Sequence, residues 1–106
     1  MNKIYEDLTI VTVLYDSSEL INDLLKNLKN FKVIVVDNGN NEHILKKLSG
    51  FKNVKVITQK KNLGYGRAIN FAFEKIKSKY FFVLNPDLVI SEKSIYDLYT
   101  LITKNP

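Results

Sequence analysis

Four short segments rich in apolar and β-branched residues alternate with amphipathic helical segments, and this alternation limits the possible folds more than any other feature. Residues 8–15 and 31–36 are continuous apolar runs, as expected of strands covered on both faces. Residues 54–58 and 80–84 are shorter strand candidates. Because the connections are short, the order favours a parallel sheet with right-handed crossovers. We therefore predict an α/β fold with a parallel sheet of about four strands and helices on both faces.

Segments with the periodicity of amphipathic helices lie between these strands and after the last one. Apolar residues recur on one helical face in residues 20–28, around residues 44–48, in residues 68–76 and in residues 95–102. Asp16 and Glu19 have capping-box spacing before the first of these helices. Ser91 is a candidate N-cap for the last one. The residues expected to face inward from the third helix are Ala68, Ile69, Ala72, Phe73 and Ile76.

Length and composition exclude several classes of protein. A chain of 106 residues fits one small domain. It has no cysteine, which excludes disulfide scaffolds and cysteine nucleophiles, and the single histidine, His43, excludes a multi-histidine zinc site. No secretion signal is visible, and no segment approaches the ~20 apolar residues that span a bilayer. The sequence therefore predicts a soluble, cytoplasmic protein, with an association at the inner face of the membrane left open.

The positive charge is concentrated in one part of the sequence. The formal net charge is +5, and residues 43–73 contain no acidic residue. The basic residues of this stretch are Lys46, Lys47, Lys52, Lys55, Lys60, Lys61 and Arg67. Such a stretch attracts anions such as nucleic acid, acidic lipid or a phosphorylated small molecule. A solvated lysine surface explains it equally well.

Unusual polar and glycine residues follow each predicted strand. Ligands of open α/β sheets bind outside the carboxyl ends of the strands, so this clustering is the main indication of a site. The candidates are Leu14, Tyr15 and Asp16 after the first strand, Asp37 and Asn38 after the second, Asn62, Gly64 and Arg67 after the third, and Asn85 and Asp87 after the fourth.

Each of these clusters also has a purely structural explanation. Asp37 could accept hydrogen bonds from a ribose or a base, or begin an Asx-turn with Asn38. The glycine-containing loop 62–67 could present backbone N–H groups and Arg67 to a phosphate, or simply enter a helix. Residues 85–87 could place two oxygen ligands on a divalent ion, or form an ordinary Asn-Pro-Asp turn.

Taken together, four segments resemble the N-terminal, nucleotide-binding half of family 2 glycosyltransferases with the GT-A fold, and within that family the rhamnosyltransferase-like branch. The matching segments are residues 11–16 (VTVLYD), 35–40 (VVDNGN), 62–70 (NLGYGRAIN) and 84–87 (LNPD). Two departures stand out, since Asp16 replaces a common Asn and Asn85 replaces the first carboxylate of the family's Asp-x-Asp motif.

The resemblance implies a function. It suggests a Rossmann-like, partial GT-A fold in which residues 1–106 form one donor-binding half-domain. The Tyr15 and Asp37 segments would hold base and ribose, loop 62–67 would lie near the nucleotide, and Asp87 with Asn85 would bind Mn²⁺ or Mg²⁺. The complete enzyme would be a hexosyltransferase of polysaccharide biosynthesis, moving a sugar from a dTDP- or UDP-sugar to a glycan or lipid-linked acceptor. The acceptor half and catalytic base are expected outside this chain, which would then be inactive alone.

A non-catalytic, self-assembling α/β module is the alternative, because a missing half would expose a sheet edge and apolar patches. It predicts a homo-oligomer. A third possibility is a basic nucleic-acid binder, which predicts generic affinity for DNA or RNA that falls steeply with salt. The donor-site interpretation instead predicts selectivity for a nucleoside diphosphate and no nucleic-acid partner.

Overall fold

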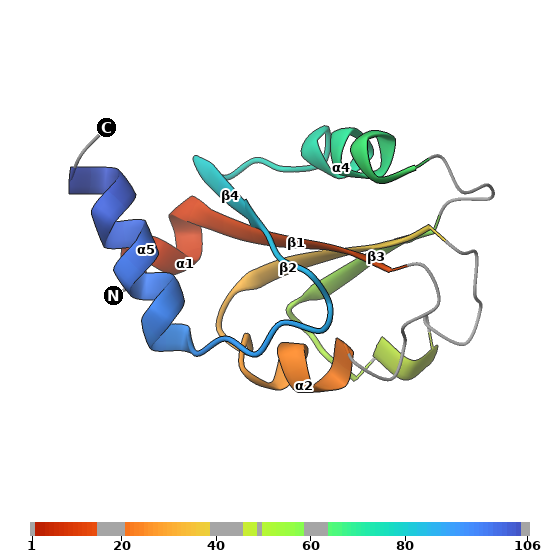
Figure 1. Ribbon diagram of the computed structural model, residues 1–106, viewed down its shortest axis with the longest axis horizontal. Helices are drawn as coiled ribbons and strands as arrows, with labels where there is room; N and C mark the ends of the chain where they lie inside the picture. Colours follow the sequence, from red (N-terminus) through yellow and green to blue (C-terminus); the bar gives the residue numbers. More distant parts are fainter. Residues whose placement is uncertain (1, 15–20, 39–45, 49, 59–63, 105–106) are drawn as a thin grey trace.

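A four-stranded parallel sheet forms the centre of the protein (Figure 1). The computed structural model describes residues 2–14, 21–38, 46–48, 50–58 and 64–104. The strands are β1 (Leu8–Leu14), β2 (Lys32–Asp37), β3 (Val54–Thr58) and β4 (Tyr80–Val83). All four predicted strands are therefore present within one or two residues of their expected limits.

The order of the strands in the sheet is β3-β2-β1-β4. β1 is central, with Leu14 aligned to Asp37 of β2 on one side and Leu8 aligned to Tyr80 of β4 on the other. Every residue of β1 is buried, which explains its continuous apolar and β-branched sequence. β3 and β4 are the outer strands of this sheet.

Helices cover both faces of the sheet, as predicted. α2 (Ile21–Lys26) packs on one face and α4 (Tyr65–Phe73) on the other (Figure 1). Residues 46–48 are also helical, and Leu48 is buried with α2. The α/β prediction is confirmed, and so is the placement of helices on both sides.

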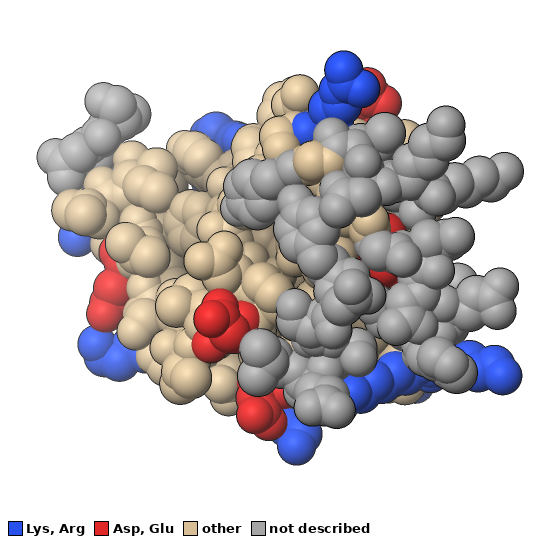
Figure 2. Space-filling model, turned by 45° about the vertical axis from the view of Figure 1, so that its right-hand side comes forward, with Lys and Arg blue, Asp and Glu red and all other residues tan. Residues whose placement is uncertain are grey.

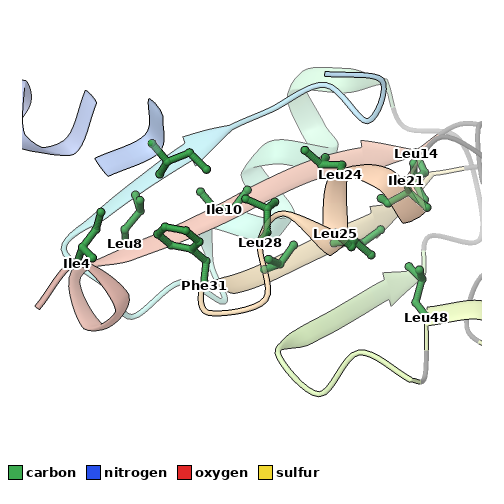
Figure 3. Close-up of a cluster of buried hydrophobic side chains, with 13 residues drawn as sticks. Ile4, Leu8, Ile10, Leu14, Ile21, Leu24, Leu25, Leu28, Phe31 and Leu48 are labelled. Carbon is green, nitrogen blue, oxygen red and sulfur yellow. The ribbon is translucent and has the colours of Figure 1, made fainter. Parts of the chain in front are cut away.

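The larger hydrophobic cluster lies between α2 and the sheet (Figure 3). Leu8, Ile10 and Leu14 of β1 enter it, together with three residues of α2 and Phe31 before β2. Val11 and Val13 point to the opposite face, where they meet Ala68 and Ala72 of α4. The two-residue alternation of β1 thus supplies both halves of the core.

A short N-terminal helix, α1 (Asn2–Asp7), was not predicted from the sequence. It is fastened to α5 (Glu92–Lys104) by two hydrogen bonds, from Tyr5 Oη to Glu92 Oε1 at 2.6 Å and from Tyr99 Oη to Asp7 Oδ2 at 2.9 Å. The backbone N–H of Ser94 donates to Ser91 Oγ at 3.1 Å, which confirms Ser91 as the cap of the last helix.

Some predictions differ from the structure. The third helix was expected to extend to Ile76, but α4 ends at Phe73, and the Phe73 side chain is 56% exposed rather than inward. Its ring still contacts Phe81 of β4 edge-on, with centroids 5.4 Å apart. The predicted capping box at residues 16–19 lies outside the described residues. In the described ranges, no helix has the length and apolar character to cross a membrane.

Candidate functional site

The carboxyl ends of three strands meet at one edge of the sheet. Leu14, Asp37 and Thr58 are aligned across β1, β2 and β3. Asp37 and the following Asn38 are 0% and 1% exposed, although both are polar. Buried polar side chains of this kind are costly unless they are hydrogen-bonded. This edge therefore has a polar interior at the position where the sequence predicts a site.

Asn38 links two of the predicted site segments. Its backbone N–H donates to the Leu14 carbonyl at 2.8 Å, and its side-chain Nδ2 donates to the Gly64 carbonyl at 3.4 Å. The same Gly64 oxygen accepts the N–H of Ala68 at 3.1 Å, in the first turn of α4. The ends of β1 and β2 and the start of α4 are thus joined through one residue, by its backbone N–H and its side-chain amide. The structure thus brings the candidate residues Leu14, Asn38 and Gly64 together.

The two glycines in residues 62–67 differ, because the backbone conformation requires glycine at position 64 but not at position 66. Gly64 has φ 83° and ψ 164°, a backbone conformation open essentially only to glycine. A Cβ at Gly64 or Gly66 would meet no heavy atom within 4 Å, so packing against protein neighbours requires neither. Arg67 is exposed in the first turn of α4, where a positive charge opposes the helix dipole.

The segment after β4 forms a turn. The Leu84 N–H donates to the Val11 carbonyl at 2.9 Å and continues the pairing with β1, after which the Leu88 N–H donates to the Asn85 carbonyl at 3.1 Å. Pro86 occupies the position that favours proline in a four-residue turn. Asn85 and Asp87 are both exposed. Their side chains leave the same turn and are available to a ligand in solvent.

The described site residues form two groups, one on β2 and α4 and one after β4. Within the described part of the chain, no hydrogen bond or ion pair joins them, and no three His, Cys, Asp or Glu residues gather into a metal cluster. Tyr15, Asp16 and Asn62 lie outside the described residues. The double role of Asn38 was not predicted, because its partner Gly64 is distant in sequence and a hydrogen-bond partner of this kind leaves no local pattern.

The strand order places a switch point at β1. β2 and β3 extend from one side of β1 and β4 lies on the other, and in open α/β sheets the crevice at such a reversal binds ligands. In Figure 2, which turns this edge toward the viewer, acidic and basic side chains both occur across the described surface. The described candidate residues around this edge carry charges of both signs, with carboxylates at Asp37 and Asp87 and a guanidinium at Arg67.

Comparison with known proteins decides the family. Residues 9–106 match the family model described as Glycosyl transferase family 2. The chain belongs to glycosyl transferase family 2. The resemblance of the four sequence segments to family 2 is therefore confirmed, while the rhamnosyltransferase-like branch stays a prediction.

Relatives in this family are considerably longer than the chain. It is 30% identical over 101 residues to the low-salt glycan biosynthesis hexosyltransferase Agl10 of Haloferax volcanii, covering 91% of this chain and 33% of that protein. It is also 30% identical over 97 residues to a teichoic acid poly(glycerol phosphate) polymerase of Staphylococcus epidermidis, covering 82% of this chain and 13% of that protein. The chain thus spans a third or less of these two relatives.

A solved structure shows the same fold. The mannosyltransferase PcManGT of Pyrobaculum calidifontis, in complex with GDP-Man and Mn²⁺, superimposes with a TM-score of 0.66 at 16% identity. The match covers 76% of the family 2 chain described here and 27% of the mannosyltransferase. It confirms the partial GT-A architecture expected from the sequence.

Proposed function

We propose that this chain is the donor-binding portion of a glycosyltransferase and holds the nucleotide diphosphate of a sugar donor. The observation that carries the proposal is the position of the polar residues at the switch point. Asp37 and Asn38 close β2 on one side of β1, and Asn85 and Asp87 follow β4 on the other. Membership of family 2 supports this assignment, as does a fold neighbour that binds GDP-Man.

The proposed roles follow from side-chain chemistry. Asp37 accepts hydrogen bonds from ribose hydroxyls or a base N–H, together with the Leu14, Tyr15 and Asp16 segment. Gly64 and Arg67 lie at the start of α4, where exposed backbone N–H groups and a guanidinium favour phosphate oxygens. Asn62 belongs to the same loop in sequence. The nucleotide would therefore bind across the ends of β1 and β2 toward α4.

A divalent metal fits the residues after β4. Asp87 and Asn85 offer one carboxylate and one amide oxygen, both exposed, and Mg²⁺ or Mn²⁺ is commonly held by one or two such ligands plus substrate phosphates and water. The fold neighbour is in complex with Mn²⁺. A bound metal would neutralise charge on the leaving diphosphate. Asp87 is the charged ligand of this pair, so we assign it the larger share of affinity.

The donor, the acceptor and the location of the complete enzyme complete the proposal. We propose a dTDP- or UDP-sugar as donor, with a glycan or lipid-linked acceptor received by polypeptide outside these residues. The 106 residues would then form one donor half-domain that binds nucleotide but transfers no sugar alone. A lipid-linked acceptor would bring the complete enzyme to the inner face of the membrane.

The test is calorimetric titration of the chain with UDP, dTDP and GDP, with and without Mn²⁺. We expect metal-enhanced binding that is lost in Asp87→Asn and reduced in Asp37→Asn. Asp97→Asn removes an exposed carboxylate on α5 and serves as the control, with unchanged binding expected. Circular dichroism establishes that each variant is folded. Absence of binding at millimolar nucleotide, or equal binding by all four proteins, would contradict the proposal.

Self-association is a second candidate, favoured by the surface beside β4. This outer strand carries no charged residue, and it borders a hollow of about 370 Å³ whose lining is apolar. The lining residues are Phe81, Phe82, Val83, Leu84, Leu98 and Ile102. An open strand edge next to apolar side chains suits a second copy related by a twofold axis. Sedimentation velocity would show a dimer that is lost in the Leu98→Lys, Ile102→Lys variant and kept in Tyr96→Lys, and a monomeric parent chain would exclude this candidate.

A further inference from the structure

A second cavity, of about 320 Å³, lies at the opposite edge of the sheet from the candidate donor site. It is lined by residues near the amino ends of β1, β2 and β3 and by the segment that follows α4. Its apolar lining includes Ile34 of β2 and Ile76, whereas the side chain of the neighbouring Val33 points to the opposite face of the sheet. The donor-site assignment makes no use of this cavity, because the residues of that site lie at the carboxyl ends of the strands.

Four lysines line the cavity, and no acidic residue is among its described lining residues. They come from three separate elements: Lys32 from β2, Lys55 from β3, and Lys75 and Lys77 from the segment after α4. Like charges gathered in one pocket repel one another, which costs folding free energy unless an anion is present. A pocket of this composition therefore favours a negatively charged occupant.

Two of these lysines are held in place without being neutralised. Lys32 Nζ donates to the backbone carbonyl of Glu6 at 2.8 Å, and Lys75 Nζ lies 5.7 Å from the centroid of the Phe71 ring. Neither partner carries a full negative charge. Lys55 and Lys77 form no ion pair with any described residue, and the ion pair found among the described residues joins Lys93 and Asp97 on α5. No ion pair with a described residue therefore neutralises the lysines of the pocket.

The wall that carries Lys75 and Lys77 is fixed to the sheet. The hydroxyls of Thr9 and Ser78 are 2.7 Å apart, and Ser78 Oγ donates to the Tyr80 carbonyl at 2.9 Å. These bonds hold the segment after α4 against the start of β1. The segment that carries Lys75 and Lys77 is therefore kept beside the strands that carry the other two lysines, which lowers the entropy lost on binding.

We propose that this cavity is an anion site for a phosphate ester, whose phosphate contacts the four lysines while its apolar body rests on Ile34 and Ile76. Lysine ammonium groups bind phosphate as point charges, and the apolar floor accommodates a ligand that is more than a bare ion. Either a soluble phosphorylated compound or the phosphate headgroup of a lipid provides this chemistry. Both would stabilise the folded chain by binding it preferentially.

The experiment uses the full chain without divalent metal and two probes, inorganic pyrophosphate and vesicles of phosphatidylcholine with or without phosphatidic acid. The Lys55→Glu, Lys77→Glu variant reverses two charges of the pocket. The control, Lys26→Glu, Lys104→Glu, makes the same change in net charge at exposed positions on α2 and α5. Amide chemical shifts locate the bound pyrophosphate, and co-sedimentation reports vesicle binding.

We expect pyrophosphate to raise the unfolding temperature of the parent chain and to shift the amides of Val33, Ile34 and Lys77 rather than that of Asn38. The pocket variant should bind at least about tenfold more weakly, since charge-assisted contacts are worth more than neutral ones. Selective co-sedimentation with phosphatidic acid, lost in the pocket variant alone, would assign the lipid source, and pyrophosphate binding without it the soluble source. Equal weakening in both variants, shifts confined to the carboxyl edge, or binding of neither probe would overturn the proposal.

Discussion

Tyr5 Oη lies 2.6 Å from Glu92 Oε1, although the two residues are 87 positions apart in the sequence. Asn30 Nδ2 donates to the same carboxylate oxygen at 3.1 Å. Glu92 therefore connects α1, α5 and the turn before β2 through one oxygen. The hydrogen bond to Glu92 raises the pKa of the Tyr5 hydroxyl, with burial as the second cause.

Removing this phenol should loosen the connection between the two helices. Tyr5→Phe keeps the ring, which packs edge-on against Phe31 with centroids 5.0 Å apart, but it deletes the donor. We expect the free energy of unfolding to fall by about 1 kcal/mol, as for a typical hydrogen bond. Tyr96→Phe makes the same chemical change on the exposed surface of α5 and should change it by less than about 0.5 kcal/mol. Urea unfolding measures both, and equal values would argue against a role for the Tyr5–Glu92 bond.

Alkaline pH should weaken the attachment of α1 to α5. Burial, followed by the hydrogen bond to Asp7, raises the pKa of Tyr99, in the same direction as that of Tyr5. A raised folded-state pKa means that the neutral phenols stabilise the fold fully below their ordinary pKa of 10.0, and that this contribution is lost as the pH rises through the raised value. The stability advantage of the parent chain over Tyr5→Phe, Tyr99→Phe should therefore shrink as the pH rises above 10.0, the ordinary pKa of the phenols. A difference that stays constant over this range would show that the phenols do not titrate in this way.

Two glycines of one loop should respond oppositely to alanine. Gly64→Ala forces a side chain into a conformation with φ 83° and ψ 164°, which should cost about 1 to 3 kcal/mol. Gly66 lies inside α4 with open space around its Cα, so Gly66→Ala should stabilise by about 0.5 to 1 kcal/mol through helix propensity. Thermal unfolding of the two variants tests this pair. A shift in the same direction would mean that the backbone conformation of Gly64 does not set its residue type.

Two threonines of β1 form a second contrasting pair. Thr12 is fully buried, and its hydroxyl has no hydrogen-bond partner among the described residues. Thr12→Val should therefore leave the free energy of unfolding unchanged or raise it by about 1 kcal/mol. Thr9→Val breaks the contact with Ser78 Oγ at 2.7 Å and should lower it by about 1 kcal/mol. Chemical denaturation distinguishes them, and a larger loss for Thr12→Val would show that its hydroxyl has a partner in solution.

The sheet and its covering helices could be predicted because their signals are local. The continuous apolar run of β1 and the Ser91 cap of α5 are each contained in a few neighbouring residues. α1 was missed because, among its described side chains, Ile4 alone is buried, and because two of its hydrogen bonds go to α5, near the other end of the chain. The predicted site segments could be placed at one edge of the sheet because each directly follows a strand in the sequence. The hydrogen bond from Asn38 to Gly64 could not be predicted, since it depends on how β2 and α4 pack.

The position of β4 beside β1 has a kinetic consequence. β1 and β2 are separated by a single helix, whereas Tyr80 reaches its partner Leu8 only after most of the chain has been traversed. Closing the larger loop costs more entropy before any contact compensates for it. We therefore expect β1, α2 and β2 to assemble early and β4 with α5 to dock late. The strand order therefore also predicts the order in which the elements fold.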